Sequence, residues 1–153
     1  MITNAAELAQ AIIDDPGHVA DCMQRIGRFG GQHETSTVLS HSVDVWWRLH
    51  DIRQVRRVTF FGLIHDCHEL ITGDATRGHT GMKMKAKQND IDKELRALLG
   101  IDLTESEFDL IHKVDMASGE DEHAHGAAVK YWCRHYLEQK VRFVHLCNEW
   151  TNR

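Results

Sequence analysis

Hydrophobic residues recur along the chain with the spacing of amphipathic helices, and almost no segment alternates apolar and polar positions with period two. Turn and capping residues divide this pattern into a series of helices. The predicted helices cover residues 3–13, 19–25, 37–50, 54–72, 82–99, 104–117, 120–136 and 139–150. The sequence therefore predicts an all-α protein, a compact bundle of about seven to eight helices.

Local signals set several of these boundaries. Thr3 is suited to cap the first helix, and Thr104-Glu-Ser-Glu107 matches a capping box, in which the Thr and Glu side chains satisfy each other's free backbone amides. Pro16, the only proline, lies in a turn after the first helix. The glycine-containing segments 27–31 and 73–81 fit neither helical nor strand periodicity, so they are predicted as loops.

The composition of the chain indicates the number of domains, the expected location and the expected classes of partner. With 153 residues, 42% of them hydrophobic, the chain can fill one core, so residues 1–153 are predicted to form a single domain. The sequence has no apolar run of about 18 residues and no signal-peptide pattern at its N-terminus, so we expect a soluble, cytoplasmic protein with no membrane partner. The net charge of -5 argues against nucleic acid as a partner and leaves small anionic substrates open.

The dipeptide His65-Asp66 interrupts an otherwise apolar helical segment. On a helical wheel, the hydrophobic residues between Val58 and Ile71 surround the helix axis, which places an imidazole and a carboxylate in an apolar setting. Burying such groups without partners costs free energy comparable to the net stability of a domain. A divalent metal ion is the leading candidate for their partner, and a hydrogen-bonded pair in the core is the alternative.

Two more polar residues occupy comparable positions. Asp115 follows Ile111 by four residues on the apolar stripe of its helix, and His41 lies at the boundary between the polar and apolar faces of another helix. Either residue alone is compatible with a structural role. Together, His41, His65, Asp66 and Asp115 suggest a ligand set that converges on one ion from three helices.

Two imidazoles and two carboxylates form a donor set of borderline hardness. Such a set suits Mn, Co, Fe, Ni or Zn, with Mg as a further candidate, and leaves coordination positions for water and a phosphate oxygen. The ion would polarise a phosphoryl group and lower the pKa of the bound water. Glu69 follows His65 by four residues, on the same side of the predicted helix and close to these positions.

At these residues the chain resembles the HD-domain metal-dependent phosphohydrolases. His41, His65-Asp66 and Asp115 match the order and approximate spacing of the ligands in that family, and Glu69 followed by Asp74 is similar to the motif of its 5'-deoxynucleotidase-like members. Arg28-Phe-Gly-Gly31 is similar to the corresponding stretch of short phage and bacterial members. The resemblance covers approximately residues 28–115 and implies an HD-domain helical bundle that hydrolyses a nucleotide.

The resemblance also implies roles for residues outside the ligand set. Glu69 would orient or deprotonate the attacking water, or protonate the leaving oxygen, with Asp74 as its supporting partner. Arg28 is our candidate for holding phosphate, because a guanidinium binds two oxygens at once, and Phe29 would pack against the sugar or base. The alternatives are solvated carboxylates at Glu69 and Asp74, a surface charge at Arg28 and a core residue at Phe29.

The loop after Asp74 departs from the related nucleotidases because it is longer and proline-free. Arg77, His79 and Lys83 place positive or ionisable groups there, which fit a triphosphate tail better than a monophosphate. Since some phage members of this fold are deoxynucleoside triphosphatases, the expected function is hydrolysis of a deoxynucleoside triphosphate, with dATP favoured, to deoxynucleoside and triphosphate. A 5'-deoxynucleotidase and a non-catalytic nucleotide-binding HD module remain the alternatives.

The last predicted helices carry large hydrophobic residues. We expect Trp132, Phe143 and Trp150 to be exposed in a single copy of the chain, which predicts a homo-oligomer. If the protein is phage-encoded, the cytoplasm in which we expect it is that of the host.

Overall fold

The computed structural model describes residues 1–28, 36–73, 81–125 and 136–152. Within these residues the chain is all-α, as predicted, with no strand beyond an isolated bridge between Gly27 and Thr37. The helices are α1 (Ala5–Asp14), α2 (Pro16–Gln24), α3 (Val38–Asp51), α4 (Arg56–Ile64), α5 (Glu69–Thr72), α6 (Gly81–Leu99), α7 (Glu105–His125) and α8 (Tyr136–Thr151).

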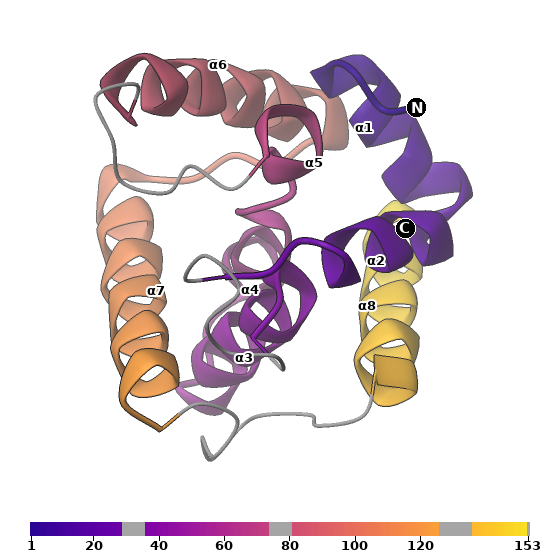
Figure 1. Cartoon of the computed structure of the whole chain (residues 1–153). Helices are drawn as coiled ribbons and strands as arrows, with labels where there is room; N and C mark the ends of the chain where they lie inside the picture. Colours follow the sequence, from indigo (N-terminus) through magenta and orange to yellow (C-terminus); the bar gives the residue numbers. More distant parts are fainter. Residues whose placement is uncertain (29–35, 74–80, 126–135, 153) are drawn as a thin grey trace.

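Helices α3 and α4 run through the centre of the bundle and pack against each other (Figure 1). α7 flanks this pair on one side and α8 on the other, while α1 and α6 pack together at one end. Because neighbours surround the central pair, every residue of α3 from Val38 to Trp46 and every residue of α4 from Val58 to Ile64 is buried. The polar residues in these two stretches are therefore held inside the protein.

The contact between α3 and α4 depends on Gly62. A Cβ atom at this position would overlap the Leu49 side chain and would lie 3.3 Å from Cγ1 of Val45. Glycine costs a helix interior about 1 kcal/mol relative to alanine, but here it allows the two backbones to approach closely. This approach sets the position of the residues that follow α4.

Capping interactions define the start of both helices that face the turn after α4. At α3, the Ser40 amide donates to Oγ1 of Thr37 (3.2 Å) and the Thr37 amide donates to Oγ of Ser40 (2.9 Å). The capping box predicted for α7 is confirmed, since the Glu107 amide donates to Oγ1 of Thr104 (3.2 Å) and the Thr104 amide donates to Oε1 of Glu107 (2.9 Å). Both boxes satisfy backbone amides that the helix itself leaves without partners.

The first two helices begin at residues other than those predicted. Asn4, and not Thr3, caps α1, and Thr3 instead donates to the Glu7 carboxylate through its amide. α2 begins at Pro16 with Asp15 as its cap, because the fixed φ of proline and its missing N–H suit the first turn of a helix.

The predicted helix over residues 54–72 is wrong in its middle. α4 ends at Ile64, and the next residues form a tight turn in which the Cys67 amide donates to the Ile64 carbonyl (2.9 Å) and the Glu69 amide to the Asp66 carbonyl (3.0 Å). Hydrogen bonds between residues three apart wind the chain more tightly than an α-helix, and hydrophobic spacing over so few residues cannot tell the two apart. His65 and Asp66 therefore lie on a turn between two helices.

The break predicted after residue 117 is also wrong. α7 continues through Ser118 and Gly119 to His125, and residues 126–135 lie outside the described part of the chain. The Ser118 hydroxyl makes hydrogen bonds to α3, and this tertiary contact offsets the low helix propensity of the Ser-Gly pair. The longer helix carries additional residues to the centre of the bundle.

The exposure expected for the last helices is wrong for two of the three residues. Phe143 is fully buried, and Trp150 is 5% exposed, stacks on Phe60 and donates from Nε1 to the Leu99 carbonyl (2.9 Å). Trp132 lies outside the described residues. No helix among those described combines the length and apolar composition that crossing a membrane requires.

Replacing Gly62 by alanine is expected to destabilise the protein by about 1–3 kcal/mol, because the added methyl group overpacks the contact with Leu49. Urea unfolding of the metal-free protein measures this change. Gly17→Ala is the matched control, since a Cβ atom there would meet Lys140 at an ordinary 3.5 Å. Equal stability of the two variants would contradict the role given to Gly62.

The capping box of α7 makes stability depend on pH. The Thr104 amide, together with Arg57, holds the pKa of Glu107 below its usual range. The stabilisation that the ionised Glu107 side chain provides is therefore present above its pKa in the unfolded chain, about 4.3, and is lost as the pH falls through its pKa in the folded chain. Glu107→Gln is therefore expected to lower stability by about 0.5 kcal/mol at neutral pH, and by less as the pH falls below about 4. Urea unfolding across this range measures the difference, which a pH-independent offset would contradict.

Candidate metal centre

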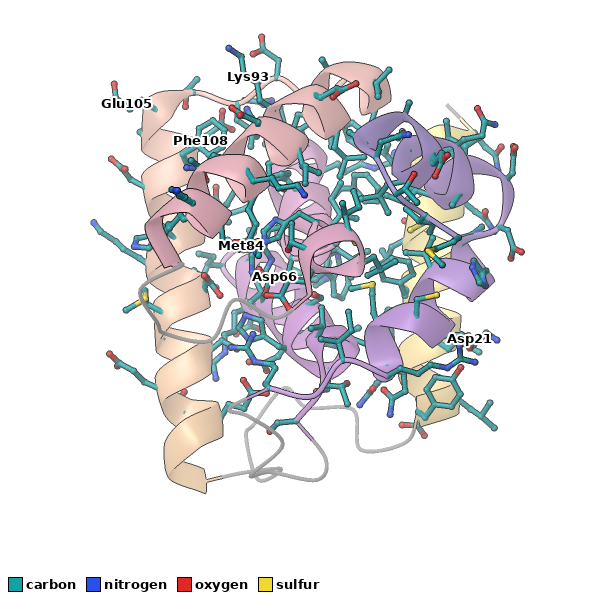
Figure 2. All side chains as sticks on the ribbon, turned by 45° about the horizontal axis from the view of Figure 1, so that its top comes forward. Asp21, Asp66, Met84, Lys93, Glu105 and Phe108 are labelled. Carbon is teal, nitrogen blue, oxygen red and sulfur yellow. The ribbon has the colours of Figure 1, made fainter. Side chains whose placement is uncertain are left out.

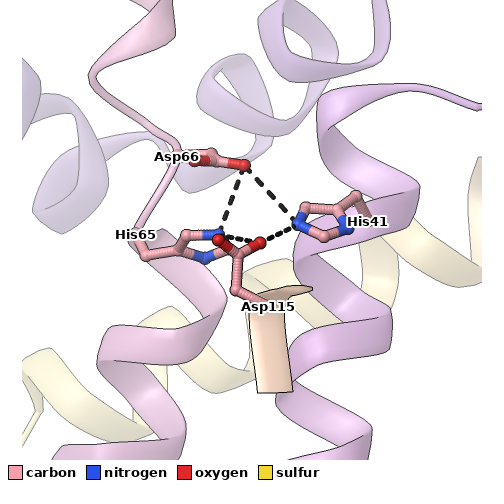
Figure 3. Close-up of side chains that lie close together, drawn as sticks. All are labelled: His41, His65, Asp66 and Asp115. Atoms are coloured by element: carbon pink, nitrogen blue, oxygen red, sulfur yellow. Dashed lines mark hydrogen bonds and ion pairs between the residues drawn. The ribbon is translucent and has the colours of Figure 1, made fainter. Parts of the chain in front are cut away.

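His41, His65, Asp66 and Asp115 lie together where three elements meet (Figure 3). His41 comes from α3, His65 and Asp66 from the turn after α4, and Asp115 from α7. One potential ligand atom of each residue lies within 4.8 Å of those of the other three. The structure thus brings the whole predicted ligand set together.

The ring nitrogens and carboxylate oxygens face one another across a short space. His41 Nε2 lies 2.6 Å from Asp115 Oδ1, and His65 Nε2 lies 3.2 Å from that oxygen and 3.3 Å from Asp66 Oδ2. Both imidazoles are buried, whereas the Asp115 side chain is 30% exposed. Figure 2 shows Asp66 among the interior side chains, while Lys93 and Glu105 point away from the bundle. The cluster is therefore deep but open on its Asp115 side.

The far nitrogen of each imidazole is held by a hydrogen bond that directs the ring. His65 Nδ1 donates to the Gly62 carbonyl (2.6 Å), and His41 Nδ1 lies 3.2 Å from Oγ of Ser118. A carbonyl only accepts hydrogen bonds, so Nδ1 of His65 carries a proton, and once an ion displaces any proton on Nε2 the lone pair of that nitrogen would face the centre. Histidine ligands of metal ions are typically oriented in this way.

A chain of hydrogen bonds behind His41 extends this support. Ser118 donates to Oδ2 of Asp44, and Arg48 donates from Nε to the same oxygen (2.8 Å) and from Nη2 to Asp121 (2.8 Å). Since the Ser118 hydroxyl gives its proton to Asp44, its oxygen accepts from His41 Nδ1. The two imidazoles therefore present Nε2 to the same point.

The charges of the cluster reinforce one another. Burial raises the pKa of Asp66 and Asp115, but the His65 and His41 imidazoles outweigh burial and hold both values well below their usual range. Burial lowers the pKa of His65, but the Asp66 and Asp115 carboxylates raise it well above its usual value. The two carboxylates thus stay ionised at neutral pH and attract positive charge to the centre.

The residues present fit a divalent metal ion. Two ionised carboxylates balance its charge, and two imidazole nitrogens add the softer donors that favour Mn, Fe, Co, Ni or Zn over an all-oxygen ion such as Mg. The hydrogen bonds behind both rings supply the outer support that such sites require. The four side chains can therefore hold one ion and leave the exposed side of Asp115 for water or a ligand.

Arg28 lies beside this centre and pairs with Glu122, a residue that was not predicted from the sequence. Its Nη1 lies 3.5 Å from Asp66 Oδ2, and its Nε donates to Oε1 of Glu122 (2.9 Å). Burial lowers the pKa of Arg28, but Glu122, Asp66 and Glu69 outweigh burial and raise it, so the guanidinium is firmly charged. Asp115, Ser118 and Glu122 follow the three-and-four spacing of one helix face, a signal hidden by the predicted break after residue 117.

The structure places the other predicted site residues at different distances from the centre. Glu69 begins α5 and is buried beside Asp66, whereas Lys83 lies on α6 with an exposed side chain. The remaining predicted residues, which lie outside the described part of the chain, are Phe29, Asp74, Arg77 and His79.

Comparison of the chain with protein-family models, with curated proteins and with solved structures finds no match. The chemistry of the centre is therefore read from its own residues. An ion held there, with an open side, an adjacent buried carboxylate and a nearby guanidinium, would be suited to polarising an anionic ligand and a water molecule.

Ser118→Ala is expected to weaken divalent metal binding by about 10–100-fold, because it removes the hydroxyl that orients His41. Titration of the metal-free protein with Mn²⁺ or Zn²⁺ against a competing chelator measures the affinity. Ser42→Ala is the matched control, because the Ser42 hydroxyl is equally buried and has no hydrogen-bond partner among the described residues. Equal affinities of the two variants would remove Ser118 from the support of the site.

Proposed function

We propose that this protein is a metal-dependent phosphohydrolase that acts on deoxynucleotides. The observation that carries the proposal is the convergence of His41, His65, Asp66 and Asp115, with both imidazoles oriented from behind. A core that needed only packing would gain nothing from four ionisable groups at one point, since burying them costs free energy. The arrangement is explained by an ion that they hold for chemistry.

When bound, the ion would polarise a phosphoryl oxygen and make a water molecule acidic enough to act near neutral pH. His41, His65, Asp66 and Asp115 would hold it. Glu69 would accept the proton of the attacking water or return one to the leaving oxygen, because its carboxylate lies beside Asp66.

Arg28 would position the phosphates of the substrate. Its charge is held at the edge of the centre by Asp66 and Glu122, both of which are fixed in the structure. A guanidinium whose stem is already ordered loses little conformational entropy when it binds an anion. A substrate with several phosphates would then extend from the ion toward Arg28.

The proposed substrate is a deoxynucleoside triphosphate, with dATP favoured, and the products are deoxynucleoside and triphosphate. This choice rests on the resemblance of the His65-Asp66 and Glu69 motif to HD-domain phosphohydrolases and on the cationic residues between Asp74 and Lys85. Hydrolysis of deoxynucleoside monophosphates is the second candidate, since the same motif resembles the 5'-deoxynucleotidase-like members. A nucleotide-binding module without catalysis would need no buried carboxylate beside the ion.

Purified protein incubated with each deoxy- and ribonucleoside mono-, di- and triphosphate, in Mn²⁺, Co²⁺, Zn²⁺ or Mg²⁺, is expected to release triphosphate from dATP. Chromatography that resolves triphosphate from inorganic phosphate makes the measurement. Glu69→Gln is expected to retain the ion held by the four ligands and to lose about 10²–10⁴-fold in rate, whereas Asp66→Ala loses both.

Glu94→Gln, an exposed substitution on α6, is the matched control and is expected to keep full activity. Phosphate release from monophosphates alone would select the second candidate. A metal-loaded protein that hydrolyses none of these nucleotides would overturn the proposed function, and full activity in Glu69→Gln would remove this carboxylate from the mechanism.

A further inference from the structure

A second group of potential metal ligands adjoins the first. Asp66, His68 and Glu69 each offer a ligand atom within 4.8 Å of the other two, and His68 and Glu69 are 7% exposed. All three come from the turn after α4 and the first residue of α5. The tight winding of this turn, in which the Glu69 amide donates to the Asp66 carbonyl, keeps them on a short stretch of chain.

The Asp66 carboxylate belongs to both groups through different oxygens. Its Oδ2 faces the first centre, 3.3 Å from His65 Nε2 and 3.7 Å from His41 Nε2. Its Oδ1 faces the other way, 3.9 Å from His68 Nε2. A carboxylate placed in this way between two sets of imidazoles can bridge two cations.

His68 is oriented in the same manner as the two imidazoles of the first centre. Its Nδ1 lies 2.8 Å from Oδ1 of Asp92, which reaches it from α6, and its Nε2 is thereby turned toward Asp66. A carboxylate behind one ring nitrogen and an ion in front of the other is the usual arrangement of a metal-binding histidine. The 3.9 Å separation between Nε2 and Oδ1 exceeds a hydrogen bond, so the two atoms do not satisfy each other directly.

The charges around His68 also favour a cation. Three carboxylates, Asp66, Glu69 and Asp92, surround the imidazole, and the Arg28 guanidinium on the Oδ2 side of Asp66 is already paired with Glu122. One imidazole and two carboxylates are donors suited to Mn or Fe, and three protein ligands leave positions for water or phosphate oxygens.

We propose that Asp66, His68 and Glu69 hold a second divalent ion, which Asp66 links to the ion of the first centre, with Asp92 as the positioning residue of His68. The proposal rests on the first centre as a metal site and adds that Glu69 binds an ion. In two-metal sites the paired ions stabilise the attacking and the leaving oxygen of one phosphoryl group. The inferred substrate class is therefore a phosphate ester.

Mn²⁺ binding to the metal-free full-length chain tests the proposal. Equilibrium binding is expected to give two Mn²⁺ ions per wild-type chain, and one ion per chain for His68→Gln. In the electron paramagnetic resonance spectrum, the two ions of the wild type are expected to couple through their shared carboxylate, and this coupling is expected to vanish in His68→Gln. His145→Gln is the matched control, because that imidazole also pairs with a carboxylate but is 62% exposed on α8.

Asp92→Asn provides a second, milder variant, which keeps His68 in place while weakening its support. We expect the weaker of the two Mn²⁺ sites to lose about 10–100-fold in affinity and the stronger site to keep its value. This pattern separates a positioning role from general destabilisation, which would weaken both sites. The circular dichroism spectra of both variants establish whether they fold. If His68→Gln does not fold, Asp92→Asn provides the test.

One ion per wild-type chain at saturating Mn²⁺, or two coupled ions in His68→Gln, would overturn the inference. The outcomes also separate it from the proposed function. A chain that hydrolyses nucleotides with one ion would contradict the second site alone, whereas a chain that binds two coupled ions and hydrolyses no nucleotide would contradict the proposed function alone.

Discussion

The close approach of α3 and α4 at Gly62 determines how the rest of the protein is arranged. It places His41 and His65 with their ring centroids 5.4 Å apart, and the Gly62 carbonyl also accepts the hydrogen bond that turns His65 toward the centre. A larger residue at position 62 would overlap the Leu49 side chain beside this acceptor. One glycine thus links the packing of the core to the geometry of the candidate metal centre.

Hydrophobic packing alone would not keep polar residues buried in the core, and hydrogen bonds and ion pairs hold them there. Asp44 is 3% exposed and shares an oxygen between Ser118 and Arg48, while the carboxylates of the centre are held by the imidazoles and Arg28. Each hydrogen bond from outside the cluster orients a group within it. These hydrogen bonds offset part of the cost of burying the charges in the metal-free chain, and they order the candidate ligands before an ion binds.

Much of the fold and of the ligand set was predictable because it depends on local spacing. Hydrophobic periodicity identified the helices, and the motif at Thr104 located the start of α7. His65, Asp66 and Asp115 stood out as polar residues at apolar positions, and His41 was included from the boundary of its helix face. Features that depend on tertiary contacts were missed. The turn after Ile64 differs from a helix only in which carbonyl each amide reaches, and the passage of α7 through Ser118 and Gly119 depends on hydrogen bonds to α3. Glu122 was overlooked as a result.

The unbroken course of α7 has a mechanical consequence. One face of this helix supplies Asp115 to the candidate metal centre, Ser118 to the imidazole of His41 and Glu122 to the guanidinium of Arg28. A rigid rod cannot shift one of these side chains without shifting the other two. Any force that slides or tilts α7 would therefore move a candidate metal ligand, the hydroxyl behind His41 and the partner of Arg28 in a single movement, so the cluster assembles or loosens as a whole.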